Sequence, residues 1–350
     1  MDGLYLIIYF SIIDIVKTLT SPFFMVLFII IFFENYKLSK SKYCLSVDKI
    51  SPIFTSLNST LYGAIGGVIT TVLLIYLEVV VVPMDFFYIL FISVLLSFIN
   101  TRFMCIAYSG SLICIINLIL GFPRINTRDI MLMVSTFHIV ESLLILLNGN
   151  GGKIPAFFER KGQFIGGFNI QRFWPIPFVI FIGDGLIKPI ALIAILYYGD
   201  YTFTYLRRKI LISSMVLLVY GFLLLGLIKV QTLSIIPPLF GIIGHEFIVY
   251  INELREKNRI PVFTNTNRGV RVIDVSKSGI AKDIGIRTGD IIVKINEITV
   301  NNSKDIEEIE YLNNRNWKIS YFSNKKGLNT KLYKGNKKSL GISVVSRGLY

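Results

Sequence analysis

Charged residues, histidine and cysteine are all scarce in this sequence. Only 17% of the residues are charged, 53% are hydrophobic, and the chain has two histidines and three cysteines. Soluble globular domains have about 25% charged residues, so this composition excludes an ordinary soluble protein. Cys44, Cys105 and Cys114 show no CxxC or metal-type spacing. This spacing therefore supports neither a disulfide framework nor a zinc motif, and we predict neither a metal nor a cofactor.

The charge that is present is mostly positive. The net charge is +14, but the basic residues lie in short segments beside apolar runs, as in proteins that face anionic lipid. We therefore predict a bilayer rather than nucleic acid as the partner of this charge. Residues 1–20 lack a basic leader and a small-residue cleavage site, and they carry Asp14 and Lys17. They predict an amphipathic helix in the membrane interface.

Long apolar runs dominate residues 21–251 and predict a polytopic α-helical membrane domain. After the run that begins at Ser21-Pro22, further runs cover 59–82, 85–101, 104–122, 130–148, 176–198 and 209–229. Each is about long enough to cross a hydrocarbon core of ~30 Å, which predicts about seven spans, with six to eight as the range. Residues 234–251 contain Pro237-Pro238 and His245-Glu246. These residues disfavour a lipid-exposed helix, so we expect this segment to lie flat or to re-enter.

The basic residues between the spans predict the orientation. Lysines and arginines gather in segments 35–49 and 149–175, which the positive-inside rule assigns to the cytoplasm. Seven spans place the C-terminal region in the cytoplasm, and eight place it outside. Arg255, Lys257 and Arg259 favour the cytoplasm, whereas Arg207-Arg208-Lys209 falls on the outer side in either scheme and conflicts with the rule.

Polar residues inside the apolar runs are candidate functional residues. His138 and Glu141 are three apart and Asp184 and Lys188 are four apart, so each pair shares one face of a predicted helix. A charged residue at the membrane centre costs ~2.5–3.5 kcal/mol, so each needs a reason. One interpretation is a transport or proton pathway, and the other is pairing that holds helices together. The small residues 63–67 predict a close helix-packing surface.

Residues 252–350 read as a separate, basic soluble domain. Within it, 269–309 alternates short β-type runs with glycine turns and one helix capped by Ser303. This order of elements resembles a PDZ domain, which is a small α+β fold. The residues that carry the resemblance are Gly269, Gly279, Gly285, Gly289, Asp290 and Asn296. The resemblance implies a protein-binding module that adds a partner peptide as a strand at a sheet edge, beside a helix.

Many bacterial PDZ domains have a permuted order of strands, which offers a candidate site at the end of the chain. If this domain is permuted, its carboxylate-binding loop is Lys338-Ser339-Leu340-Gly341-Ile342, close to the Gly-Leu-Gly-Phe type of loop. Lys337 and Lys338 would then favour an anionic peptide end. The alternative is that residues 340–345 form only a closing strand and that the lysines lie in a solvated turn.

The sequence contains no complete set of catalytic residues in the spacing that a known enzyme motif requires. A many-pass protein ending in a PDZ domain invites comparison with site-2 metalloproteases, and His245-Glu246 is the only candidate for their zinc motif. That motif needs a second histidine four residues later, where this chain has Val249. We therefore predict no catalytic residues. The alternatives kept open are a protease-like protein and a regulatory or receptor protein with a PDZ domain.

A wider resemblance extends over most of the chain. The segment before Ser21-Pro22, the run from His138 to Phe178 and the run 244–263 resemble the MinJ-like family of membrane proteins, which set division-site topology in Gram-positive rods. The resemblance implies a non-enzymatic adaptor that links a polar coiled-coil protein to the Min system. It further implies a multi-pass protein of the cell membrane, enriched at septum or poles, whose partners are division-site or polar-targeting proteins.

Overall fold

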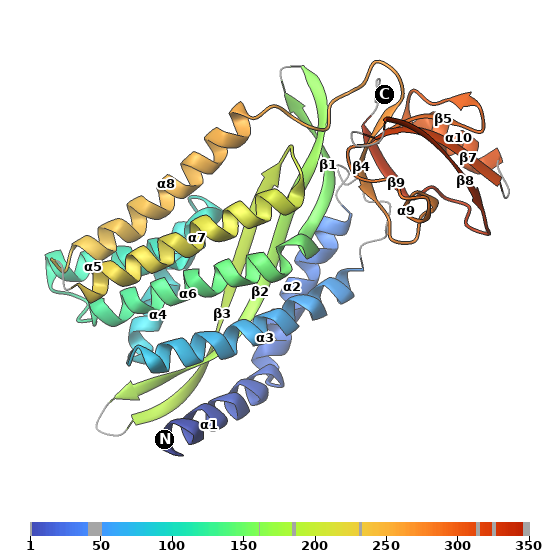
Figure 1. The fold of residues 1–350 in the computed structure, drawn as a ribbon. Coiled ribbons are helices and arrows are strands. Elements are labelled where there is room, and N and C mark those ends of the chain that lie inside the picture. Colours follow the sequence, from blue (N-terminus) through green and yellow to red (C-terminus); the bar gives the residue numbers. More distant parts are fainter. Residues whose placement is uncertain are drawn as a thin grey trace.

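The computed structural model comprises a helical region that ends at Asn258 and a smaller domain of strands and short helices that follows it (Figure 1). The residues that it describes are 2–40, 51–160, 162–183, 187–230, 233–312, 316–323 and 327–345. The helices of the first region are α1 (Asp2–Leu19), α2 (Pro22–Ser39), α3 (Pro52–Tyr76), α4 (Pro83–Ser97), α5 (Ile106–Leu120), α6 (Thr127–Asn148), α7 (Leu206–Lys229) and α8 (Ile236–Asn258), with the 3-10 turns η1 (Thr101–Met104) and η2 (Gly149–Gly152).

The helices largely occupy the predicted apolar runs. Four of the described helices are long and apolar enough to cross a membrane: α2, α3, α6 and α7. Two more, α4 and α5, are apolar but only 15 residues each. They meet at η1, opposite the middle of α6 and α8, where Arg102 Nη2 lies 2.7 Å from Glu246 Oε1. Helices α4 and α5 therefore form a short hairpin, and Arg102 in the turn between them contacts the middle of α8.

The expectation for residues 234–251 was wrong in one respect. They do not re-enter as a broken segment: from Ile236 onward they belong to the continuous helix α8, which runs on to Asn258. Pro237 and Pro238 are in the first turn of α8. There a proline is tolerated because the missing N–H would have no partner within the helix.

The prediction of a helix over 176–198 was also wrong. This segment belongs to a three-stranded antiparallel sheet with the order β1 (Lys153–Arg160), β2 (Gln163–Gly183) and β3 (Ile187–Thr202). Its apolar run is continuous because side chains from β2, such as Trp174 and Phe178, are buried among the helices. Such a run does not distinguish a buried strand from a helix, whereas Pro175 and Pro177 favour an edge strand.

Helix α3 lies directly against β2. A Cβ at Gly63 would be 2.1 Å from the carbonyl oxygen of Pro175, and one at Gly67 would be 1.9 Å from that of Pro177. The predicted small-residue packing surface is therefore confirmed, but its partner is a strand. Close approach also lets Thr71 Oγ1 accept a hydrogen bond of 3.0 Å from the Val179 N–H. The side chain thus satisfies a backbone donor at the edge of β2.

The C-terminal domain is a six-stranded antiparallel sheet with two helices. Its elements are β4 (Val270–Val275), α9 (Ile280–Asp283), β5 (Ile291–Ile295), β6 (Ile298–Thr299), α10 (Ser303–Leu312), β7 (Asn316–Ser323), β8 (Gly327–Lys334) and β9 (Ile342–Val345). The described strands follow the order β8-β7-β5-β4-β9, with β6 paired to β5. The last strand in the chain therefore lies at an edge of the sheet, beside β4. The core beneath the sheet contains Val272, Ile292, Trp317 and Leu340.

The two regions are in direct contact. Lys153 Nζ of β1 lies 2.6 Å from Asp274 Oδ1 of β4, and the N–H of Gly166 donates to the carbonyl oxygen of Phe263 at 2.8 Å. A Cβ at Gly166 would be 2.4 Å from the side chain of Val345, at the end of β9. The glycine at position 166 therefore lets β2 pack against the sheet of the C-terminal domain.

Candidate functional site

The loop before β9 is held by α9 and by the end of β4. The N–H groups of Ile280 and Ala281 donate to the carbonyl oxygens of Ser339 and Leu340 at 3.2 and 3.0 Å, and the N–H of Ser276 donates to that of Gly341 at 2.8 Å. These contacts hold the loop's carbonyl oxygens against α9 and the end of β4. The N–H of Leu340 points to α10 instead. The predicted loop Ser339 to Ile342 is therefore a rigid turn at the edge of the sheet.

A carboxylate already binds to this loop. The N–H of Leu340 donates to Glu310 Oε1 at 2.6 Å, and Ser339 Oγ donates to the same oxygen at 3.1 Å. Glu310 is in the last turn of α10, on the side of that helix nearest the loop. Burial raises the pKa of the Glu310 carboxyl above its ordinary value, and the hydrogen bonds from Leu340 and Ser339 act in the opposite direction. The loop can thus bind a carboxylate through a backbone amide.

The lysines beside the loop are not equivalent. Lys337 Nζ lies 2.6 Å from Asp283 Oδ2 in an exposed ion pair, whereas Lys338 is exposed. Gly341 has a φ of 66°, and a Cβ at Gly279 would be 2.4 Å from the Leu340 carbonyl oxygen. These two glycines allow the loop to approach α9 closely.

The remaining motif residues form the predicted turns. Gly269, Gly285 and Gly289 have φ values of 83°, 83° and 95°, and Asn296 has a φ of 49°. These values lie in the left-handed region that glycine and asparagine favour. Asp290 Oδ2 accepts a hydrogen bond of 3.0 Å from the N–H of Arg287, which closes the turn before β5. The sequence pattern thus predicted these turns correctly.

The polar residues of the helical region divide into two groups. His138 on α6 and His245 on α8 meet at Cys105, just before α5, and the ligand atoms of the three lie within 4.8 Å of one another. Glu246 instead bonds through Oε1 to Arg102 and through Oε2 to the hydroxyl of Tyr108, both at 2.7 Å. These residues lie far apart in the chain, so no spacing in the sequence connects them.

The two predicted pairs on helix faces have different outcomes. Glu141 makes no ion pair with His138, and within the described part of the chain it makes no hydrogen bond. Lys188 lies in β3 opposite Ile182, and Asp184 lies outside the described residues. Lys188 is thus in a strand, so the prediction that these two residues share one face of a helix was wrong.

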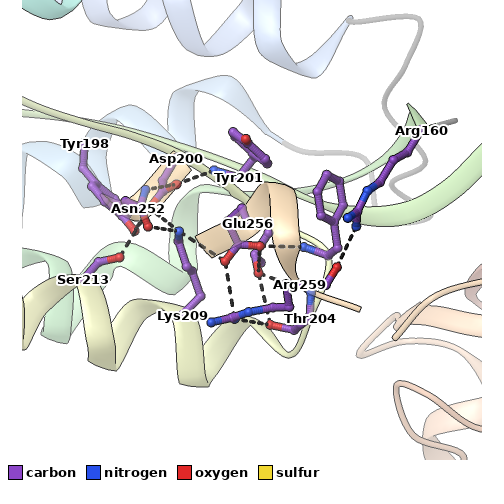
Figure 2. A network of polar contacts seen from close by, with 12 residues as sticks. Arg160, Tyr198, Asp200, Tyr201, Thr204, Lys209, Ser213, Asn252, Glu256 and Arg259 are labelled. Carbon is purple, nitrogen blue, oxygen red and sulfur yellow. Dashed lines mark hydrogen bonds and ion pairs between the residues drawn. The ribbon is translucent and has the colours of Figure 1, made fainter. Parts of the chain in front are cut away.

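Figure 2 shows a buried polar network that the sequence analysis missed. Lys209 near the start of α7 lies 3.0 Å from Asp200 Oδ2 of β3 and 3.5 Å from Glu256 Oε1 of α8, and all three side chains are at most 5% exposed. Arg259, just after α8, also pairs with Glu256 at 3.4 Å. The network fixes the end of α8, where the chain passes into the C-terminal domain. The sequence signal for this network is Lys209, the last residue of the basic group Arg207-Arg208-Lys209 and the first residue of an apolar run.

A second missed cluster surrounds Arg172 of β2. Its Nη2 donates to Asn58 Oδ1 at 2.7 Å and also to Asn148 Oδ1, which accepts a further hydrogen bond of 3.1 Å from Trp174 Nε1. Arg172 is 1% exposed. It is therefore a structural residue that joins β2 to α3 and α6, and not a residue of an exposed loop.

The comparisons with known proteins bear on the C-terminal domain. A family model described as PDZ domain matches residues 261–333. No curated protein and no solved structure matches the chain. The matched residues include β4 to β7, all but the last residue of β8 and the turns at Gly269, Gly285 and Gly289, and the loop and β9 lie beyond the match in the chain. Residues 261–333 of this chain form a PDZ domain.

Proposed function

We propose that this protein is a membrane-anchored adaptor that binds protein partners through its PDZ domain. The observation that carries the proposal is the hydrogen bond from the Leu340 N–H to the Glu310 carboxylate. PDZ domains receive a peptide at a sheet edge with its terminal carboxylate on backbone N–H groups. Glu310 takes the place of that carboxylate, and β9 is the edge strand beside which the peptide would lie. This is the permuted arrangement, with the binding strand last in the chain.

The apolar helices and the basic residues support a multi-pass membrane protein with a cytoplasmic PDZ domain. Asn148 at the end of α6 donates to Asn58 near the start of α3, and Lys209 near the start of α7 contacts the last turns of α8. These four helix ends therefore lie at one end of the bundle, next to the PDZ domain. The hairpin β2–β3 returns the chain to this same end, so Arg207 and Arg208 join the other basic residues there. This arrangement removes the conflict with the positive-inside rule.

The proposed adaptor is not an enzyme. Both carboxylate oxygens of Glu246 are engaged, one by Arg102 and the other by Tyr108. These contacts support a structural role for Glu246 rather than the role of a general base. The resemblance to MinJ-like proteins supports a role in division-site placement, with division-site or polar-targeting proteins as partners. A fluorescent fusion should then gather at septa or poles, and uniform membrane staining through the division cycle would contradict that role.

Peptide binding to the full-length protein in detergent tests the adaptor proposal. The probes are two labelled peptides of one sequence that ends in valine, one with a free terminal carboxylate and the other with a terminal amide. Glu310→Ala removes the internal competitor, and Glu307→Ala, on an exposed position of α10, is the matched control. A hydrogen bond to a charged group contributes about 1.5–3 kcal/mol, so Glu310→Ala should bind the free-acid peptide ~10–100-fold more tightly.

The control variant should bind like the unaltered protein, and the amidated peptide should bind weakly to all three. Equal binding of both peptides, or weaker binding of the free acid to Glu310→Ala, would overturn the assignment of the loop. A reporter fused after Tyr350 tests the orientation separately. A signal from outside the cell would exclude contact between the PDZ domain and cytoplasmic partners.

A further inference from the structure

We propose that Cys105, His138 and His245 bind one thiophilic metal ion with a closed d shell, Zn²⁺ or Cu⁺. The three residues come from three separate parts of the fold: the tip of the α4–α5 hairpin, the middle of α6 and the middle of α8. Cys105 Sγ lies 3.4 Å from His138 Nε2 and 3.6 Å from His245 Nε2. In a tetrahedral zinc site with Zn–S of ~2.3 Å and Zn–N of ~2.1 Å, a sulfur and a nitrogen ligand are ~3.6 Å apart.

Hydrogen bonds fix the tautomer of each imidazole. His138 Nδ1 lies 2.7 Å from the carbonyl oxygen of Val134, which can only accept, so Nδ1 carries the proton. Tyr108 donates its hydroxyl proton to Glu246, so the Tyr108 oxygen, 3.1 Å from His245 Nδ1, accepts from that nitrogen. Both Nε2 atoms are thus unprotonated, and both face Cys105 Sγ. Metal-ligating histidines are oriented in this way, by an acceptor on the other ring nitrogen.

Without a metal ion, hydrogen bonds among Cys105, His138 and His245 cannot satisfy both Nε2 atoms. The Cys105 thiol has one proton, so it can donate to only one of the two Nε2 atoms. Among the described residues, no other group donates a hydrogen bond to the second Nε2 atom. An unsatisfied buried acceptor costs about 1–3 kcal/mol. One metal ion bound to the thiolate and to both imidazoles would satisfy all three groups.

The ligand set selects the class of ion. Thiolate favours Cu⁺ and Zn²⁺, and imidazole suits both metals, whereas Mg²⁺ and Ca²⁺ prefer oxygen ligands. Binding releases the thiol proton, forms one metal–sulfur and two metal–nitrogen bonds, and changes no oxidation state. Cu⁺ with one thiolate is neutral, and Zn²⁺ with one thiolate keeps one positive charge. Glu141 lies one turn along α6 from His138, and loss of its carboxyl proton on metal binding would balance that charge.

Metal binding by the untagged full-length protein in detergent tests the proposal. The purified protein is titrated with Zn²⁺ or, under reducing conditions, with Cu⁺, and its bound metal is measured by mass spectrometry. Cys105→Ser removes one ligand, and Tyr108→Phe removes only the orienting partner of His245. The matched control is Cys114→Ser, which alters a buried cysteine within α5, the helix that Cys105 precedes.

The expected result is about one ion per chain in the unaltered protein and in Cys114→Ser, as the three residues form one site. Loss of an orienting partner typically weakens metal binding ~10–100-fold, which is the effect expected for Tyr108→Phe, with a larger loss for Cys105→Ser. Binding of neither ion by the unaltered protein, or full binding by Cys105→Ser, would overturn the proposal.

A second measurement needs no variant and so does not depend on how a variant folds. A small alkylating reagent is applied to the unaltered protein with a chelator, with Zn²⁺ or with Cu⁺, and labelling is mapped at each cysteine. One of the two ions should protect Cys105 and leave the labelling of Cys114 unchanged. Equal labelling of Cys105 with and without both ions would contradict the metal site.

Discussion

The helical region and the PDZ domain expose opposite kinds of surface. The helices turn large apolar side chains outward, among them Phe54 at 69% and Leu61 at 60% exposure, and bury Lys209, Arg172 and His138. The PDZ domain instead buries an apolar core and leaves most of its lysines exposed. A region with an apolar exterior must satisfy its polar groups internally. A domain in water can leave polar binding groups near the surface. In the PDZ domain, the Leu340 N–H at the edge of the sheet donates to the Glu310 carboxylate.

The largest effect is expected where a buried charge loses its partner. Lys209→Met keeps the side-chain volume but leaves the carboxylates of Asp200 and Glu256 buried without their shared cation. Breaking a buried pair costs about 3–5 kcal/mol, and we expect a loss of this size in the free energy of unfolding in detergent. Lys337→Met, which breaks an exposed pair in the PDZ domain, should cost at most about 1 kcal/mol. If both variants lose a similar amount of unfolding free energy, the proposed difference between the two regions is wrong.

A smaller effect is expected at the contact between α3 and β2. Gly67→Ala places a methyl group against the Pro177 carbonyl oxygen, so α3 or β2 must shift, at a cost of about 1–3 kcal/mol or more. Gly226→Ala in α7 is the matched control, because a Cβ there would meet nothing within 4 Å. That substitution should be neutral or stabilise by about 0.5–1 kcal/mol. Thermal unfolding of both variants measures the difference, and an unchanged Gly67→Ala would contradict the close packing.

The smallest effect concerns pH and the PDZ domain alone. Burial raises the pKa of Glu310, so the folded domain holds a proton at Glu310 more tightly than the unfolded chain does. The resulting stabilisation is complete below roughly pH 4.3, the pKa of a free glutamate, and is lost as pH rises through the higher folded value. In Glu310→Gln, the unfolding free energy of the PDZ domain should therefore fall less as the pH rises above roughly 4.3.

The chain offers a direct readout of this prediction, since it has two tryptophans, one in each region: Trp174 in β2 and Trp317 in β7. In a Trp174→Phe background, Trp317 fluorescence reports unfolding of the PDZ domain. Glu308→Gln on the exposed face of α10 is the control, and it should keep the pH dependence of the unaltered protein. A steeper fall for Glu310→Gln would contradict the raised pKa.

The sequence predicted local structure well where a residue has a local role. The turns at Gly285 and Gly289 need positive φ values, and the apolar run of α6 is long enough to identify it as a helix. It failed at 176–198, since apolar length alone does not separate a strand pair buried among helices from one helix. It also failed at Lys209 and at Cys105, because their partners lie on other elements and no spacing rule connects them.

The glycine face of α3 also has a consequence for the order of assembly. Translation proceeds at about 5–20 residues per second, so on the order of ten seconds separates the synthesis of Gly67 from that of Pro177. During this interval α3 has no strand to cover, and its small residues can be occupied by lipid chains or by another helix. Docking of the β2–β3 hairpin must displace that occupant. A chaperone or insertase that keeps this face free would therefore act on the nascent chain, before the PDZ domain has been synthesised.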